Sequence, residues 1–240
     1  MNPELGLLTG LLDVISQQTQ STIDSVMGPA KYIFDRMLTI AIVILGIMVA
    51  SGSGKIIEDS FKFFLKIGFL YFVVNNYAML STVIVDSMIM LGLQIGGSNI
   101  TVEVMKNPSD IVGKGLVYSE PLFRWMSDAS LIDFALNILE TIITGLVALI
   151  IVVCFFWMGI SVFVTWAEFH ISLGLSVIML AFSPLKQTAW ISEGAIKSPV
   201  MYAVKFGVQA TILSLISPLM NSIAIEENPT FSVVDRKSVV

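Results

Sequence analysis

Glu168 and His170 lie two residues apart between two strongly apolar segments, and His170 is the only histidine of the chain. A carboxylate and an imidazole in such a place could hold a metal ion, relay a proton or form a polar turn at a membrane surface. A catalytic zinc ion needs three protein ligands of the His, Glu, Asp or Cys type. With one histidine, and Cys154 as the only cysteine, the chain lacks the residues for such a site. We therefore predict no metal and no cofactor.

Nucleophilic catalysis is the other chemistry that a lone histidine suggests. A Ser-His-Asp triad would place His170 beside a serine in a turn of the G-x-S-x-G type. The sequence contains no such turn. We therefore predict no catalytic residues and no enzymatic activity.

A polar turn is the simplest interpretation of this segment. Trp166 would lie at the level of the lipid headgroups, where aromatic side chains collect, while Glu168 and His170 stay in water. The alternative places Glu168 inside a helical bundle, where a carboxylate marks a pathway or an assembly contact. Both interpretations require membrane helices on either side of the segment.

The composition predicts such helices. The 240 residues are 55% hydrophobic and 13% charged, against about 25% charged in an ordinary soluble domain. Because a soluble fold of this length cannot bury so much apolar surface, we predict an all-α, polytopic membrane protein with about five transmembrane helices. The formal net charge of −5 is scattered, so we expect no direct binding of nucleic acid.

The N-terminal segment has the pattern of an amphipathic helix. Leu5, Leu8 and Leu12 recur at steps of three and four, with polar residues on the other side. Gly28-Pro29 should end this helix, because glycine favours a helix cap and proline the first turn of the next helix. The expected organisation is an amphipathic helix at 1–28, the first membrane helices at 29–97, an extracytoplasmic loop region at 98–140, transmembrane helices at 141–225 and a short tail at 226–240.

The apolar stretch 61–97 is interrupted by Lys62, Lys66, Asp86 and the pair Asn75-Asn76. As a single helix it would reach about 55 Å, well beyond the roughly 30 Å of a bilayer core. We favour one long tilted helix that leaves the membrane, with Lys62 and Lys66 reaching the interface. The alternative is two helices hinged at Asn75-Asn76, in which case Asp86 is buried and needs a partner.

Two further spans are expected after the loop region. Residues 141–165 carry no charge and form the clearest span. The segment 171–182, which follows the polar turn, is expected to be a separate helix. It either starts at Trp166 or is re-entrant, and it ends at Ser183-Pro184.

The last expected span, 200–225, carries small and hydroxyl residues at spacings of three and four. In lipid, a stripe of this kind marks a face where another helix approaches closely. We predict that this face packs against a helix and joins copies of the chain in an oligomer. Its residues are Ala203, Gly207, Ala210, Ser214, Ser217 and Asn221.

Residues 166–216, with the segment NPSDIVGKGL upstream, resemble the TrbL family, polytopic inner-membrane subunits of bacterial conjugation and type IV secretion machines. Three patterns carry the resemblance: W-x-E-F beginning at Trp166, L-A-F-x-P ending at Pro184, and K-x-G-V beginning at Lys205. The resemblance covers most of 61–217. It implies an assembly role without chemistry, in support of pilus or stalk assembly and of the passage of DNA or protein.

The resemblance also implies location and partners. It implies a pentameric ring in the bacterial inner membrane, with the N-terminus outside and the C-terminus in the cytoplasm. Its expected partners are membrane lipids, a stalk or pilus-like subunit and other inner-membrane components of the secretion system. A small-solute or proton-coupled channel or transporter is the alternative function. That alternative requires an indispensable Asp86 or Glu168, whereas an assembly subunit predicts a dispensable Glu168.

Overall fold

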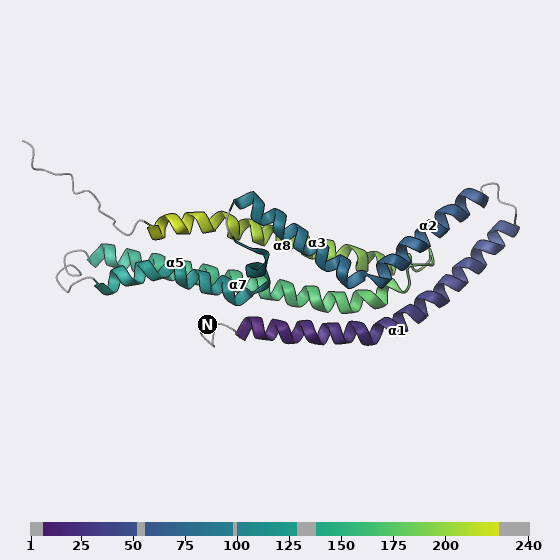
Figure 1. Cartoon of the computed structure of the whole chain (residues 1–240), viewed down its shortest axis with the longest axis horizontal. Helices are drawn as coiled ribbons and strands as arrows, with labels where there is room; N and C mark the ends of the chain where they lie inside the picture. Colours follow the sequence, from purple (N-terminus) through teal and green to yellow (C-terminus); the bar gives the residue numbers. More distant parts are fainter. Residues whose placement is uncertain (1–6, 52–55, 98–99, 129–137, 226–240) are drawn as a thin grey trace, which may run out of the picture.

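The computed structural model describes residues 7–51, 56–97, 100–128 and 138–225. This part of the chain is an elongated set of helices that run side by side along one axis (Figure 1). The expected all-α fold is therefore confirmed. The helices are α1 (Leu7–Ala50), α2 (Ile56–Asn75), α3 (Tyr77–Gly96), α4 (Val102–Lys106), α5 (Pro108–Asp128), α7 (Ile138–Leu180) and α8 (Ala189–Ile225).

Four helices of the described part, α1, α3, α7 and α8, are long and apolar enough to cross a membrane. Three of them exceed the thickness of a bilayer. At 43 residues, α7 is roughly 64 Å long, whereas a bilayer core is about 30 Å thick. These four spans compare with about five expected from the sequence. The difference arises because two segments that were expected to be separate spans lie in α7.

The predicted helix end at Gly28-Pro29 is wrong. One helix of 44 residues, α1, contains Pro29 in its interior, and it changes direction along its length in Figure 1. A proline removes one helical hydrogen bond and disfavours a straight helix. Here tertiary packing keeps the backbone helical, because Ala30, directly after the proline, and Phe34, one turn later, are 2% and 1% exposed.

The favoured single helix over 61–97 is also wrong, and the hinged alternative holds. The break lies at Asn76, between α2 and α3. The Asn75 side chain donates a hydrogen bond to the Tyr71 carbonyl at 2.8 Å, and Asn76 donates to the Phe72 carbonyl at 2.9 Å. Asparagine side chains that bond to the preceding turn compete with the helical backbone, which explains the position of the break.

The central region is more regular than the loop that the sequence predicted. It contains α5, a helix of 21 residues that begins at Pro108, a favoured residue for the first helical position. Ile111 and Tyr118 on one face are 0% and 8% exposed, and Figure 1 shows α5 alongside the first half of α7. The glycines and prolines of this region had suggested loops, but Gly115 serves close packing: a Cβ there would overlap the Phe155 side chain.

The turn predicted at Trp166, Glu168 and His170 is wrong as well. All three residues lie inside α7, which continues without interruption to Leu180. The chain then turns through residues 181–188 before α8 begins, so the predicted helix end before Pro184 is confirmed. The two polar residues do not interrupt the helix: Glu168 pairs with Lys205 of α8, and the His170 ring contacts the Trp166 carbonyl one turn earlier.

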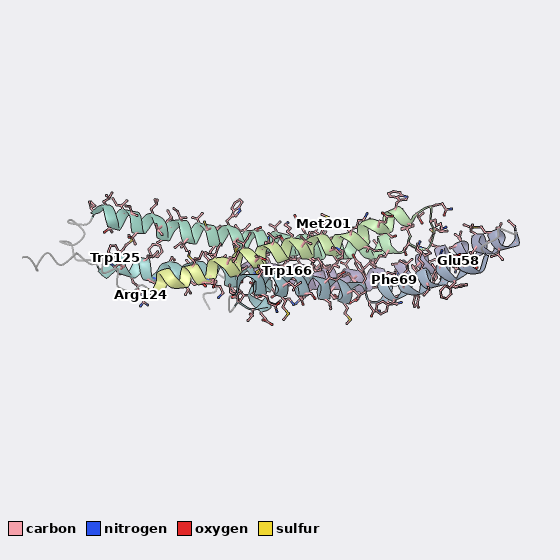
Figure 2. All side chains as sticks on the ribbon, turned by 90° about the horizontal axis from the view of Figure 1, so that it is seen from above. Glu58, Phe69, Arg124, Trp125, Trp166 and Met201 are labelled. Carbon is pink, nitrogen blue, oxygen red and sulfur yellow. The ribbon has the colours of Figure 1, made fainter. Side chains whose placement is uncertain are left out.

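One end of the molecule is much less packed than the rest. We call residues 37–50 of α1 together with α2 the arm; Figure 1 shows it extending beyond the ends of α3, α7 and α8. Many of its apolar side chains are exposed, among them Ile47 at 62%, Phe64 at 61% and Phe69 at 63%, whereas Leu70 and Val74 near the end of α2 are buried. Figure 2 shows Phe69 and Glu58 along this arm and Trp166 near the middle of the molecule. A helix that is apolar on all sides requires lipid or protein around it.

Candidate functional site

The closest helix contact joins α3 and α8, which run parallel. Gly92 and Gly96 of α3 form a G-x-x-x-G pattern that sequence reasoning missed, although the signal was present. A Cβ on Gly92 would overlap the carbonyl oxygen of Gly207, and one on Gly96 would overlap Ser214. The two backbones can approach this closely only because these positions lack a side chain.

Hydrogen bonds fix this contact near both ends of α3. The Tyr77 hydroxyl donates to the Ala195 carbonyl at 2.6 Å. The Ser214 hydroxyl donates to the Leu93 carbonyl at 2.7 Å. Both bonds are buried, where a hydrogen bond is harder for water to replace.

The small-residue stripe of α8 therefore has a partner within the same chain. Ala203, Ala210 and Ser214 are each 0% exposed and Ser217 is 5% exposed, while a Cβ on Gly207 would lie 3.2 Å from the Met88 carbonyl oxygen. The Ser217 hydroxyl also lies 2.8 Å from that of Tyr118. The structure thus replaces the predicted contact between copies by a contact within one chain. The side chain of Asn221 lies outside the described residues.

Trp166 does not anchor at a membrane surface. It is 5% exposed, and its indole Nε1 donates to the Met105 carbonyl of α4 at 2.9 Å. Its ring packs on Phe206 with centroids 4.4 Å apart and on Phe169 at 5.7 Å. Trp166 therefore joins α4, α7 and α8 at one point. Buried indole nitrogens ordinarily find such an acceptor.

His170 lies one turn after Trp166 on α7, with its ring centroid 5.7 Å from that of the indole, and it borders α1. Its Nδ1 is 2.8 Å from the Trp166 carbonyl oxygen, one turn earlier. The ring borders an apolar groove of about 480 Å³ that α1 and α7 form between them, with Thr19 and Gly174 also in its wall. The carbonyl contact accounts for one ring nitrogen, which fits a packed residue better than a metal ligand.

Both carboxylates that the sequence singled out form ion pairs with lysines. Lys205 Nζ lies 3.1 Å from Glu168 Oε2, and Lys106 Nζ lies 2.8 Å from Asp86 Oδ2. Asp86 Oδ1 accepts no hydrogen bond from the described residues. The hinged alternative required a partner for Asp86, and Lys106 supplies it. Sequence reasoning named neither lysine as a partner, although a lone Lys205 within a span calls for an opposite charge.

A row of polar side chains continues from Glu168 and Lys205 along the contact of α7 and α8, which run antiparallel. Gln209 Nε2 donates to the Ser161 hydroxyl at 3.0 Å and to the Thr165 hydroxyl at 3.2 Å. At the other end of the row the hydroxyls of Ser172 and Ser198 form a hydrogen bond. We call this row the α7–α8 stripe: Ser161, Thr165, Glu168 and Ser172 of α7, with Ser198, Lys205 and Gln209 of α8.

Other predicted residues lie apart from this row. Lys62 pairs with Glu58 of α2 at 2.5 Å, and Lys66 is exposed on the same helix. Both belong to the arm. Among the described residues, no three His, Cys, Asp or Glu side chains gather where they could hold a metal ion. The absence of a metal centre and of catalysis remains a prediction.

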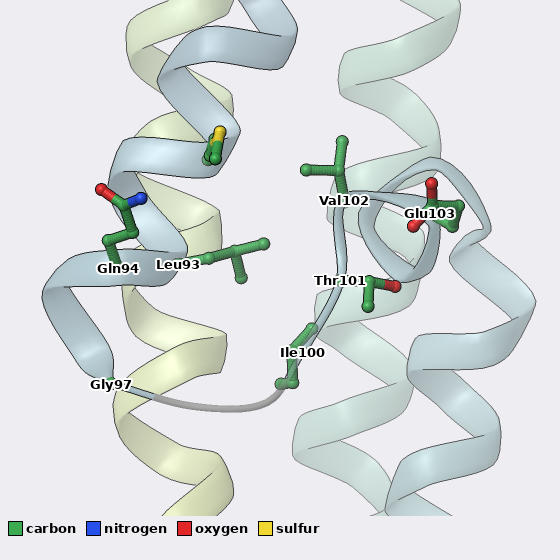
Figure 3. Close-up of a pocket in the computed structure, with 8 residues that line it drawn as sticks. Leu93, Gln94, Gly97, Ile100, Thr101, Val102 and Glu103 are labelled. Carbon is green, nitrogen blue, oxygen red and sulfur yellow. The ribbon is translucent and has the colours of Figure 1, made fainter.

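A second cavity, of about 600 Å³, lies between the end of α3 and α4. Figure 3 shows its lining, in which Gln94 and Glu103 are the longest polar side chains. Hydrogen bonds from its own backbone N–H and from the Thr101 hydroxyl lower the pKa of Glu103. This carboxylate lies outside the candidate spans and stays ionised in ordinary buffers.

Together these features define a class: a multi-pass helical membrane protein whose polar residues mostly join its own helices. The family model of the TrbL/VirB6 plasmid conjugal transfer protein matches residues 38–233. The chain therefore belongs to the TrbL/VirB6 family, as the resemblance implied, and is a component of a conjugal transfer or type IV secretion system. No curated protein and no solved structure matches the chain.

Proposed function

We propose that the protein is a structural subunit of the inner-membrane complex, which supports assembly of the stalk or pilus and passage of the DNA or protein substrate. This proposal is based on the helix contacts that Asp86, Trp166 and Glu168 make. Each is held by a residue of another helix of the same chain. Side chains committed to helix contacts suit a scaffold better than a transport cycle, in which a carboxylate must exchange ions or protons.

We further propose a homo-oligomeric ring, with five copies as the family resemblance implies. The apolar surface supports this. Exposed apolar side chains run from the arm to the far end of α7, where Leu139 and Leu146 are 71% and 57% exposed. Because helices such as α7 are longer than a bilayer is thick, lipid alone cannot cover that surface in the extended arrangement. We expect neighbouring copies of the chain, the stalk-like subunit and other inner-membrane components to bury this apolar surface.

The main test is an in-frame deletion in a strain that carries the whole secretion system. We expect loss of substrate transfer and of stalk or pilus assembly, with recovery when the gene is supplied in trans. Purification through a tag on the protein should recover the stalk-like subunit, and native mass spectrometry should count the copies. Normal transfer by the deletion strain would contradict the proposal.

We propose that the N-terminus and the central region lie outside the cytoplasm. A cysteine at Ser127, exposed at the end of α5, should react with an impermeant maleimide in intact spheroplasts. Cys154 is exposed as well, so the experiment uses a Cys154→Ser background. Reaction only after lysis would show that the central region lies in the cytoplasm, the opposite of the proposed orientation.

The proposed cytoplasmic C-terminus is tested separately. Four crossings return a chain to the side on which it began, so a cytoplasmic C-terminus requires one crossing beyond the four candidate spans. Fusion of alkaline phosphatase or of green fluorescent protein to the C-terminus reports the side directly. An active phosphatase fusion would place this end outside the cytoplasm.

A further inference from the structure

The ion pair of the α7–α8 stripe lies within two candidate membrane spans, Thr141–Leu180 and Ala189–Met220. The Glu168 and Lys205 side chains are 47% and 46% exposed. Hydrocarbon does not solvate an exposed carboxylate and ammonium, so charged side chains in spans face protein or water. The outer side of this pair is therefore not covered by lipid tails.

The surface beside the stripe is apolar at the same level of the molecule. On α7, Val164 and Ile171 are 41% and 57% exposed, and on α8, Val204 and Val208 are 52% and 54% exposed. Apolar side chains at this density need lipid or protein around them. The polar stripe is thus a narrow band on a surface that otherwise suits the membrane.

The chemistry of the stripe suits water better than a second helix. The stripe mixes hydroxyls, an amide and one pair of opposite charges, so its formal charge is zero. Gln209 Oε1 is a buried acceptor that takes no hydrogen bond from the described residues, so its expected partner is an ordered water between α7 and α8. A protein helix would need matching donors and acceptors in register along the whole row, whereas water satisfies each group separately.

We propose that the exposed side of the α7–α8 stripe, centred on Glu168 and Lys205, lines a water-filled passage through the membrane in the assembled complex, with the buried Thr165 behind it. This inference rests on the proposed function in one respect, since several copies are needed to enclose a lumen that two helices cannot enclose. The wall has no net charge and consists of hydroxyl, amide and ion-paired groups. Such a wall keeps water in the passage without holding a charged substrate strongly.

The test measures the reactivity of single cysteines in membranes that contain the complete secretion complex. In a Cys154→Ser background, Ser172→Cys and Gln209→Cys probe the stripe. Their matched controls, Ile171→Cys and Val208→Cys, lie one residue away on the apolar surface. Only a thiolate reacts quickly with charged methanethiosulfonates, and thiolates form in water. We expect the stripe cysteines to react at least about tenfold faster than their controls, since one pKa unit changes the thiolate fraction about tenfold.

Two results would overturn the inference. Slow reaction at all four positions would mean that protein covers the stripe. Equally fast reaction at all four would mean that this section of α7 and α8 lies outside the bilayer. Neither result bears on the proposed function, which is judged by transfer and stalk assembly in the deletion strain.

A charge test sharpens the result. Glu168→Gln leaves Lys205 unpaired and makes the stripe positive, whereas Lys205→Met makes it negative. The rates of an anionic and a cationic reagent are measured at Gln209→Cys. We expect the anionic-to-cationic rate ratio to rise about fivefold in Glu168→Gln and to fall about fivefold in Lys205→Met. Unchanged ratios in both variants would contradict a passage in which reagent and ion pair share the same water.

Discussion

The α3–α8 contact and the arm are built from similarly apolar helices, yet the contact buries its side chains within the chain, whereas many apolar side chains of the arm are exposed. Where α3 meets α8, Gly92 and Gly96 lie against the backbone or side chain of the partner helix. In the arm, a Cβ on Gly46 or Gly68 would meet nothing within 4 Å. Because lipid is as apolar as leucine, hydrophobicity alone does not join membrane helices. The α3–α8 contact has closely approaching small residues and buried hydrogen bonds, so it packs within the chain. The arm lacks such close approach at its glycines and requires lipid or another protein around it.

The largest expected effect compares phenylalanines of the two regions. Phe206 is 0% exposed between Trp166 and Phe169, whereas Phe64 of the arm is 61% exposed. Phe206→Ala should lower the free energy of unfolding by about 3–5 kcal/mol, because it leaves a cavity in the core. Phe64→Ala should change it by less than about 1 kcal/mol. Unfolding in detergent, followed by intrinsic fluorescence, measures both.

Equal losses in the two phenylalanine variants would contradict the difference between the regions. It would mean that the arm packs on a partner that persists in detergent. A co-purified protein or a larger particle in size-exclusion chromatography would then identify that partner.

A second prediction compares glycine substitutions in the two regions. Gly92→Ala introduces a Cβ that overlaps the Gly207 carbonyl, so α3 and α8 must separate, at a cost of about 1–3 kcal/mol. Gly46→Ala in the arm meets open space and should stabilise the helix by up to about 1 kcal/mol. Opposite signs are expected in the same unfolding assay. Two stabilising changes would contradict the close approach of α3 and α8.

The sequence predicted helix type better than helix ends. The all-α class and the chain turn before Pro184 followed from apolar runs and turn residues. The ends at Gly28-Pro29 and at the Trp166–His170 turn were wrong, because both segments are packed against other helices: Phe34 is buried after the proline, and Trp166 and Phe169 are buried within α7. Local propensity cannot register a contact with a helix far away in the sequence.

At the candidate site, too, the sequence did not identify which distant helices are in contact. The stripe of α8 indicated close packing, but its spacing could not distinguish another copy of the chain from α3 of the same chain. The G-x-x-x-G at Gly92 and Gly96 was the missing half of that signal. By contrast, the contact of Trp166 with the Met105 carbonyl leaves no trace in the sequence, because any residue supplies a carbonyl.

An intermediate effect is expected where a single hydrogen bond joins elements within the packed region. Trp166→Phe keeps an aromatic ring beside Phe206 but removes the donor to the Met105 carbonyl. The buried acceptor then has no partner, which should cost about 1–3 kcal/mol. Trp157→Phe is the matched control, since Trp157 is 74% exposed and should change stability little. Similar losses in the two variants would argue against a specific role for the indole nitrogen.

The smallest effect is expected at Glu168. Its ion pair with Lys205 joins two helices, but both side chains are about half exposed. Exposed ion pairs contribute about 0–1 kcal/mol, because water already solvates both charges. Glu168→Gln should therefore insert normally and unfold within about 1 kcal/mol of the wild type, in contrast to Phe206→Ala in the same bundle. Lys205→Met, which removes the other partner, should behave alike. A loss above about 3 kcal/mol in either variant would mean that the pair is desolvated, as a buried pair is when one partner is removed. Lost transfer in a Glu168→Gln complex that still assembles would instead make the carboxylate a working group, as the transporter alternative requires.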